Sequence, residues 1–201
     1  MAPIVGVLLA AGFSTRFGSD KLMQGLPNGA PLAVQACRNL LAGVDGVLAV
    51  VRPGNENLAQ CLSDAGATVK ICVDAEQGMG ASLAFGVGAS CDAAAWVIAL
   101  ADMPWVAPLT ICKVADALRA GALMAAPAWQ GQRGHPVGFS QKLRNELISL
   151  KGDVGARSVI QAHKNLLHLI ECDDPGVIRD IDHPDDLKPA NNILCQRPRN
   201  S

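Results

Sequence analysis

Two kinds of charged residue follow apolar runs in this chain, and both suit a phosphorylated substrate. The first run ends in a glycine-rich segment, residues 9–21, that contains Arg16 and Lys21. Small residues let the backbone approach a triphosphate, while guanidinium and ammonium groups bind phosphate oxygens. The segment has neither the Walker pattern nor the G-x-G-x-x-G pattern of dinucleotide-binding folds. By itself it predicts either a phosphate-binding loop or an ordinary surface loop.

Carboxylates supply the second feature. Asp102 directly follows the apolar run 96–101, where it could bind Mg²⁺ or cap the next turn. Asp180 and Asp182 alternate in an extended segment, so their side chains point to opposite sides and one could be a second metal ligand. Mg²⁺ needs only one or two carboxylates when phosphates complete its coordination.

A second glycine turn precedes an expected helix. Gly78, Met79 and Gly80 lead into a helical pattern that begins near Ala81. The first N–H groups of such a helix could bind a base edge or an anion. Met79 could line that pocket or belong to the core.

The later part of the chain contains further polar candidates. His135 could act as a base, orient a substrate or form a structural hydrogen bond. Asp153 and Arg157 stand four residues apart at a helix start. They could form a helix cap with an intrahelical ion pair, or Arg157 could bind a second phosphate.

Apolar runs and helical patterns alternate along the chain, and this predicts how the polar residues are positioned. Strands are expected at 4–10, 47–51, 69–73, 96–101, 123–126, 136–139 and 166–171, and residues 129–134 are expected to form a turn. Helices are expected at 32–41, 55–65, 81–87, 108–120, 141–150 and within 152–163. Alternation through residue 126 predicts a parallel sheet with helices on both faces. Ligands bind at the carboxyl ends of such strands, so the loops 10–21, 74–80 and 102–105 should converge.

Length and composition narrow the class of protein. The 201 residues suit one domain, residues 1–187, followed by a polar tail, residues 188–201. A net charge of −1 and the absence of Tyr argue against a nucleic-acid-binding protein. The seven cysteines form no C-x-x-C pair and are expected to be free thiols in a reducing cytosol, with a zinc site or a set of disulfides as the alternative. The N-terminal apolar run is too short for a membrane span and lacks the basic region of a signal peptide, so a cytoplasmic protein without membrane contact is expected.

Taken together, the motifs resemble the molybdenum cofactor nucleotidyltransferases. The opening LAAG-x-S-x-R-x-G-x-x-K is followed by GMGASL, LADMP, GHPVGF, GDVGAR and DIDHPDDL in that family's order, over residues 4–187. The resemblance implies a three-layer α/β/α sandwich with a mostly parallel, Rossmann-like sheet of the nucleotide-diphospho-sugar transferase type. It also implies Mg²⁺-dependent transfer of a nucleoside monophosphate from an NTP to a phosphorylated pterin, with release of pyrophosphate.

The resemblance further implies roles for individual residues. Lys21, Arg16 and Asp102 would be the catalytic residues, and Asp102 and Asp182 would hold Mg²⁺. The nucleotide would contact Leu9, Ala10, Ala11, Gly12, Arg16, Lys21, Gly78, Met79, Ser82 and Asp102. The pterin substrate would contact Gly134, His135, Pro136, Asp153 and Arg157.

Two nucleotide preferences occur in the resembling family. The LAAG sequence with Ala11 resembles the cytidylyltransferase branch, which implies CTP, whereas the guanylyltransferase branch tends to have LAGG. Gly80 departs from the Ser that the cytidylyl branch often carries. A molybdenum hydroxylase could receive the product. A guanylyltransferase, a nucleotidyltransferase acting on a sugar or polyol phosphate, and a non-enzymatic pterin carrier are the alternatives.

Overall fold

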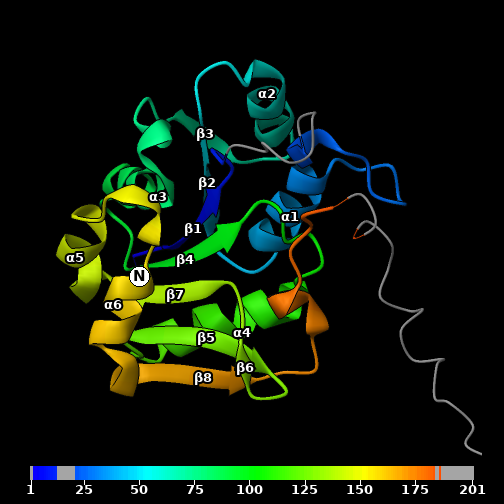
Figure 1. Ribbon diagram of the computed structural model, residues 1–201. Helices are drawn as coiled ribbons and strands as arrows, with labels where there is room; N and C mark the ends of the chain where they lie inside the picture. Colours follow the sequence, from blue (N-terminus) through cyan, green and yellow to red (C-terminus); the bar gives the residue numbers. More distant parts are fainter. Residues whose placement is uncertain (1, 13–20, 184–185, 187–201) are drawn as a thin grey trace, which may run out of the picture.

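One eight-stranded sheet with helices on both faces forms the protein (Figure 1). The structure, a computed structural model, describes residues 2–12, 21–183 and 186. The strands are β1 (Ile4–Leu9), β2 (Gly46–Val51), β3 (Thr68–Ile71), β4 (Ala95–Leu100), β5 (Met124–Trp129), β6 (Gln132–Arg133), β7 (Val137–Ser140) and β8 (Leu167–Glu171). The α-helices are α1 (Leu32–Leu41), α2 (Glu56–Asp64), α3 (Met79–Gly88), α4 (Pro108–Arg119), α5 (Arg144–Ile148) and α6 (Arg157–Ala162).

The sheet is mostly parallel, as the alternation of elements predicts. Its order is β3-β2-β1-β4-β7-β5-β6, in which the short β6 is antiparallel to β5, and β8 pairs with β5 in parallel. Strands β3, β2, β1 and β4 are parallel to one another, whereas β7 is antiparallel to both of its neighbours. The carboxyl ends of β1, β2 and β4 therefore meet at one rim of the sheet, where α/β proteins bind ligands.

Side-chain alternation along the strands produces the three layers. On β1, Ile4 and Leu8 pack into a core shared with α1, α2 and α4, whereas Val7 and Leu9 pack into a second core shared with α3, α5 and α6. Successive side chains of a strand point to opposite faces, so a strand that is apolar at nearly every position must be covered on both sides. The predicted three-layer α/β/α fold is confirmed.

The antiparallel direction of β6 and β7 was not predicted, and a tight turn after β5 explains it. Gln130 and Gly131 both have positive φ angles, 51° and 77°, and they connect β5 to β6. Two consecutive positive φ values give the turn that reverses a strand into a hairpin. The expectation of a turn over 129–134 was therefore too broad, because β5 runs to Trp129 and the chain returns through β6 and β7.

Several element boundaries also differ from expectation. The expected helix 141–150 is a 3-10 turn, η3 (Gln141–Leu143), followed by the short α5. The remaining 3-10 turns are η1 (Lys21–Met23), η2 (Ala75–Gln77), η4 (Gly152–Val154), η5 (Lys164–Leu166) and η6 (Pro175–Ile178).

The six cysteines in the described part of the chain are free, whereas Cys195 and the tail 188–201 lie outside it. Among the described residues, no helix has the length and hydrophobicity that crossing a membrane requires.

Candidate active site

A lysine ammonium group lies between two carboxylates at the carboxyl rim of the sheet. Lys21 Nζ is 3.1 Å from Asp102 Oδ2 and 2.8 Å from Asp182 Oδ1. The Lys21 side chain is only 10% exposed, while those of Asp102 and Asp182 are 28% and 49% exposed. The ion pairs are therefore desolvated on the lysine side and open to solvent on the Asp182 side.

Strand pairing explains why these three residues meet. The β1–β4 register pairs Leu9 with Leu100, so Asp102 lies at the rim just beyond the end of β1. The chain leaving β1 returns at Lys21, the first residue of η1. Asp182 is brought in from the other end of the chain, because Ile181 N donates a hydrogen bond of 3.0 Å to the Asp102 carbonyl.

The local electrostatics favour a charged lysine. Burial lowers the pKa of Lys21, but hydrogen bonds and charges from Asp182 and Asp102 outweigh it, so the pKa lies above its usual value. Burial raises the pKa of Asp102, and the charge of Lys21 partly offsets that effect. Asp180 raises the pKa of Asp102 further through its negative charge, which places Asp180 in the same electrostatic neighbourhood.

The two carboxylates have the chemistry that a hard divalent cation requires. Asp102 and Asp182 already direct oxygens at one cation, the Lys21 ammonium. Magnesium and manganese prefer such oxygen ligands, and phosphates with water can complete the coordination. The residues present therefore fit a divalent metal ion.

The second glycine turn packs against the segment that contains Asp153. Gly78 has a φ of +112°, and a Cβ built there would lie against Asp153 Oδ1 and 2.6 Å from the Gly152 carbonyl oxygen. Met79 is 46% exposed and contacts Gly155, whereas Ser82 is only 4% exposed. Asp153 is thus beside residues that the sequence assigned to the nucleotide.

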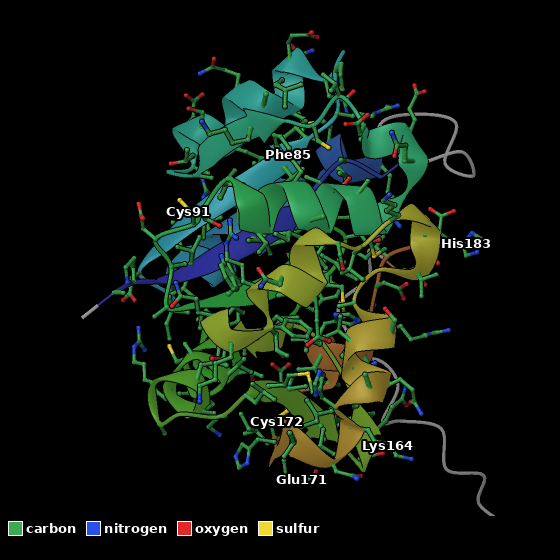
Figure 2. All side chains as sticks on the ribbon, turned by 90° about the vertical axis from the view of Figure 1, so that its left-hand side faces the viewer. Phe85, Cys91, Lys164, Glu171, Cys172 and His183 are labelled. Atoms are coloured by element: carbon green, nitrogen blue, oxygen red, sulfur yellow. The ribbon has the colours of Figure 1, made fainter. Side chains whose placement is uncertain are left out.

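Helix α3 directs its first turn toward the same rim. Figure 2 shows Cys91, which follows α3, and His183, which follows Asp182, on opposite sides of the molecule. Ala11, Ala75 and Leu83 belong to the same buried cluster, so the end of β1 and the start of α3 contribute to the core on the same face of the sheet. Residues 9 and 11 and the start of α3 therefore pack in the same layer of the protein.

His135 lines a small cavity beneath the Asp102 loop. Leu100, Met103, Asn39 and Pro136 are among the other residues that line it. Burial lowers the pKa of His135 to about 4, with a further lowering by Arg133 and an opposing effect of Asp180. The imidazole is consequently neutral at pH 7.

Other predicted residues occupy varied positions. Leu9, Ala10 and Ala11 are buried at the end of β1, Gly12 is exposed, and Gly134 is packed against Val177.

Arg157 is exposed at the first position of α6, and no ion pair joins it to Asp153. The intrahelical ion pair considered from the sequence is therefore wrong. Arg16 lies outside the described residues.

Sequence reasoning missed two polar residues that hold the Asp102 loop. Asn39 Nδ2, from the last turn of α1, donates to the carbonyls of Pro104 and Val106 at 2.9 and 3.0 Å. Asp174 accepts a hydrogen bond from Ala107 N at 2.9 Å. An Asp before Pro signals a turn, but nothing in the sequence indicates its partner 67 positions away.

The fold and the site define the class of protein. An ammonium group and two carboxylates meet beside the end of β1, at the ligand-binding rim of a Rossmann-like sheet, which is the arrangement of an α/β enzyme acting on phosphorylated substrates. Residues 6–166 match the MobA-like NTP transferase domain family. The chain belongs to that family and is a nucleotidyltransferase.

Individual relatives match over most of their length. The purine catabolism protein PucB of Bacillus subtilis is 30% identical, over 91% of this chain and 93% of its own. Nicotine blue oxidoreductase of Paenarthrobacter nicotinovorans is 29% identical, over 89% of this chain and 92% of its own. The solved structure of Rv0371c from Mycobacterium tuberculosis has a TM-score of 0.79 and 27% identity, over 92% of this chain and 95% of its own. That protein has also been solved in complex with manganese.

Proposed function

We propose that this protein transfers CMP from CTP to the terminal phosphate of molybdopterin or molybdenum cofactor and releases pyrophosphate. The observation that carries the proposal is the cation-and-carboxylate cluster of Lys21, Asp102 and Asp182 beside the end of β1. The choice of CTP and of a pterin acceptor rests on the LAAG, GHPVGF and GDVGAR motifs. The site is expected to work in the cytoplasm, with a molybdenum hydroxylase as the recipient of the product.

The reaction proposed is an in-line displacement at phosphorus. An oxygen of the acceptor phosphate forms a bond to the α-phosphorus of CTP, while the bond from the α-phosphorus to the bridging oxygen of the β-phosphate breaks and pyrophosphate leaves. The acceptor phosphate is already ionised at pH 7, so no strong general base is needed. Both reactants are anions, so the main task of the protein is to neutralise and align them.

Each group of residues would contribute to that task. Lys21 and Arg16 would bind the triphosphate, with the backbone of residues 9–12 close to the phosphates. Asp102 and Asp182 would hold Mg²⁺, and the bound ion would neutralise phosphate charge and orient the triphosphate. The nucleoside would contact Gly78, Met79 and Ser82.

The acceptor would be held by the remaining predicted residues. His135 is neutral at pH 7 and so would orient the acceptor rather than remove a proton. Gly134, Pro136, Asp153 and Arg157 would complete this part of the site. Because Asp153 lies against Gly78, the acceptor and nucleotide regions would adjoin there.

A direct assay tests the proposal. Purified protein is mixed with Mg²⁺, molybdopterin and one of CTP, GTP, ATP or UTP, and pyrophosphate release is measured. Release with CTP in preference to the other nucleotides is expected. Release with GTP alone would instead support a guanylyltransferase. Release only when a sugar or polyol phosphate replaces the pterin would identify that phosphate as the acceptor. Pterin binding without release under any condition would indicate a carrier.

The name of one relative favours a second candidate function. The Paenarthrobacter relative is named as an oxidoreductase. A redox activity of this chain would consume an added reductant in the absence of any NTP. Such consumption, together with no pyrophosphate release, would replace the transfer reaction proposed here.

A further inference from the structure

Asp174 is a buried carboxylate outside the predicted site. It follows β8, precedes η6 and is 8% exposed. It also lies beyond the residues that match the family, which end at 166. A buried carboxylate is costly unless its oxygens are hydrogen-bonded, so its partners indicate what it does.

The carboxylate joins two segments that are distant in the sequence. Asp174 Oδ2 accepts from Ala107 N at 2.9 Å and from Thr110 Oγ1 at 2.6 Å, while Oδ1 accepts from Gly176 N at 3.0 Å. Ala107 is the N-cap of α4, and Thr110 belongs to its first turn. A negative charge is favourable at that end of a helix. Asp174 therefore ties the start of α4 to the segment that follows β8.

Each of the two joined segments carries one carboxylate of the site. Asp102 lies five residues before Ala107, and Asp182 lies eight residues after Asp174. Further contacts connect the same segments: Ile181 N donates to the Asp102 carbonyl at 3.0 Å, and Gly176 packs on the Trp105 carbonyl so closely that a Cβ would not fit. Within this contact region, Asp174 supplies the buried charge.

The same segment also supports the acceptor side. His135 N donates a 2.7 Å hydrogen bond to the carbonyl of Val177 in η6. A Cβ built on Gly134 would clash with Val177, so the backbone before His135 sits directly on η6. A displacement of η6 would therefore move both Asp182 and His135 relative to Asp102.

We propose that Asp174 is a positioning residue that sets the separation of the Asp102 and Asp182 carboxylates by holding residues 174–182 against the start of α4. This inference rests on the proposed function, in which those carboxylates hold the metal ion. It makes Asp174 necessary for metal affinity, and not only for the stability of the fold. Groups that orient metal ligands typically change metal affinity 10–100-fold when they are mutated.

The test measures Mn²⁺ affinity of the intact protein, with and without CTP, by the electron paramagnetic resonance signal of free Mn²⁺. We expect Asp174→Asn, which keeps the shape but loses the charge, to bind Mn²⁺ roughly 10-fold more weakly per folded molecule. The folded fraction is measured in the same buffer by circular dichroism. Thr110→Val removes one hydrogen bond of the carboxylate and should show a smaller loss, whereas Thr110→Ser should retain wild-type affinity.

Asp45→Asn is the matched control. Asp45 Oδ2 accepts from Ile4 N at 2.8 Å and Oδ1 pairs with Arg119, at the start of β1 and β2 and therefore at the opposite rim. This variant should lose stability but keep wild-type Mn²⁺ affinity. If Asp174→Asn and Thr110→Val behave like the control, Asp174 is only structural and the inference is overturned. If the wild type binds neither CTP nor Mn²⁺, the proposed function fails and the inference fails with it.

Discussion

Lys21 Nζ and Asp182 Oδ1 are 2.8 Å apart, although 161 positions separate them in the sequence. The same ammonium group is 3.1 Å from Asp102 Oδ2, so it lies between the two carboxylates that would hold a divalent cation. Without it, two carboxylates would face each other across a partly buried gap, which is unfavourable. Lys21 therefore acts as the counter-ion of the site, and an entering metal ion must compete with it.

Replacing Lys21 should change metal binding and catalysis in opposite directions. We expect Lys21→Met to bind Mn²⁺ roughly 10-fold more tightly in the absence of nucleotide, because repulsion between two like charges at short range costs at least about 1 kcal/mol even in water. CTP-dependent pyrophosphate release should fall about 100-fold or more, since one preorganised charge on the triphosphate is lost. Metal titration and kcat/KM measure the two effects. Lys113→Met, an exposed lysine on α4, is the control, and weaker Mn²⁺ binding by Lys21→Met would contradict the counter-ion role.

Asp102 is expected to matter for activity more than for folding. Burial raises its pKa above the usual value, so the folded protein gains little stability from its charge. Asp102→Asn should therefore reduce pyrophosphate release about 100-fold or more while thermal unfolding stays close to wild type. Asp116→Asn is the matched control, because Asp116 is exposed and forms a surface salt bridge with Arg119, and this variant should remain active. Full Mg²⁺-dependent activity of Asp102→Asn would remove Asp102 from the catalytic set.

The sequence predicted the first half of the fold better than the second. Strong apolar runs, stopped by Gly, Pro or Asp, predicted β1, β2 and β4, and the 32–41 pattern predicted α1 with the bounds observed. The rim shared by Lys21 and Asp102 follows from parallel pairing. The antiparallel β7 could not be predicted, because its reversal depends on positive φ angles at Gln130 and Gly131, and Gln rarely signals such a turn.

The contacts of the site that the sequence did not predict were missed for a different reason. Asn39 stands in the last turn of a helix and Asp174 follows an edge strand, so neither belongs to a local pattern that indicates chemistry. Their partners are distant carbonyl and N–H groups, and a single sequence does not contain those pairings. The position of Asp153 against Gly78 is a tertiary contact of the same kind.

The stability of the protein should fall between neutral and acidic pH because of His135. Burial lowers its pKa to about 4 in the folded protein, with Arg133 adding to the effect and Asp180 opposing it. The unfolded chain takes up this proton near the usual value of about 6.5, so the stabilising effect is complete above that pH and is lost as the pH falls toward 4. The loss from this group is about 3 kcal/mol, at roughly 1.4 kcal/mol per pKa unit. The raised pKa of Asp102 has the opposite effect, because protonation of this carboxyl at acidic pH increases the stability of the folded protein.

Urea unfolding at pH 7, 6, 5 and 4.5 separates the contribution of His135. His135→Gln should have a smaller decrease in the free energy of unfolding across this range than the wild type. His168→Gln, at an exposed position on β8, should keep the wild-type dependence. An unchanged pH dependence in His135→Gln would show that other groups cause the acid loss.

Gly78 should tolerate no side chain, although Gly88 at the other end of the same helix should. Gly78 has a φ of +112°, and an added Cβ would lie 2.5 Å from the Gly152 carbonyl carbon, so both the backbone conformation and the contact with η4 oppose Ala. At Gly88 an added Cβ would meet no atom within 4 Å, and the backbone there needs no positive φ. We expect Gly78→Ala to lose about 2 kcal/mol or more of unfolding free energy and Gly88→Ala to be neutral or up to about 1 kcal/mol more stable. Nucleotide titration should show weaker CTP binding for Gly78→Ala alone, because residues 151–153 must move away from α3. Equal stability and equal CTP affinity of the two variants would mean that the packing of η4 on α3 does not shape the nucleotide site.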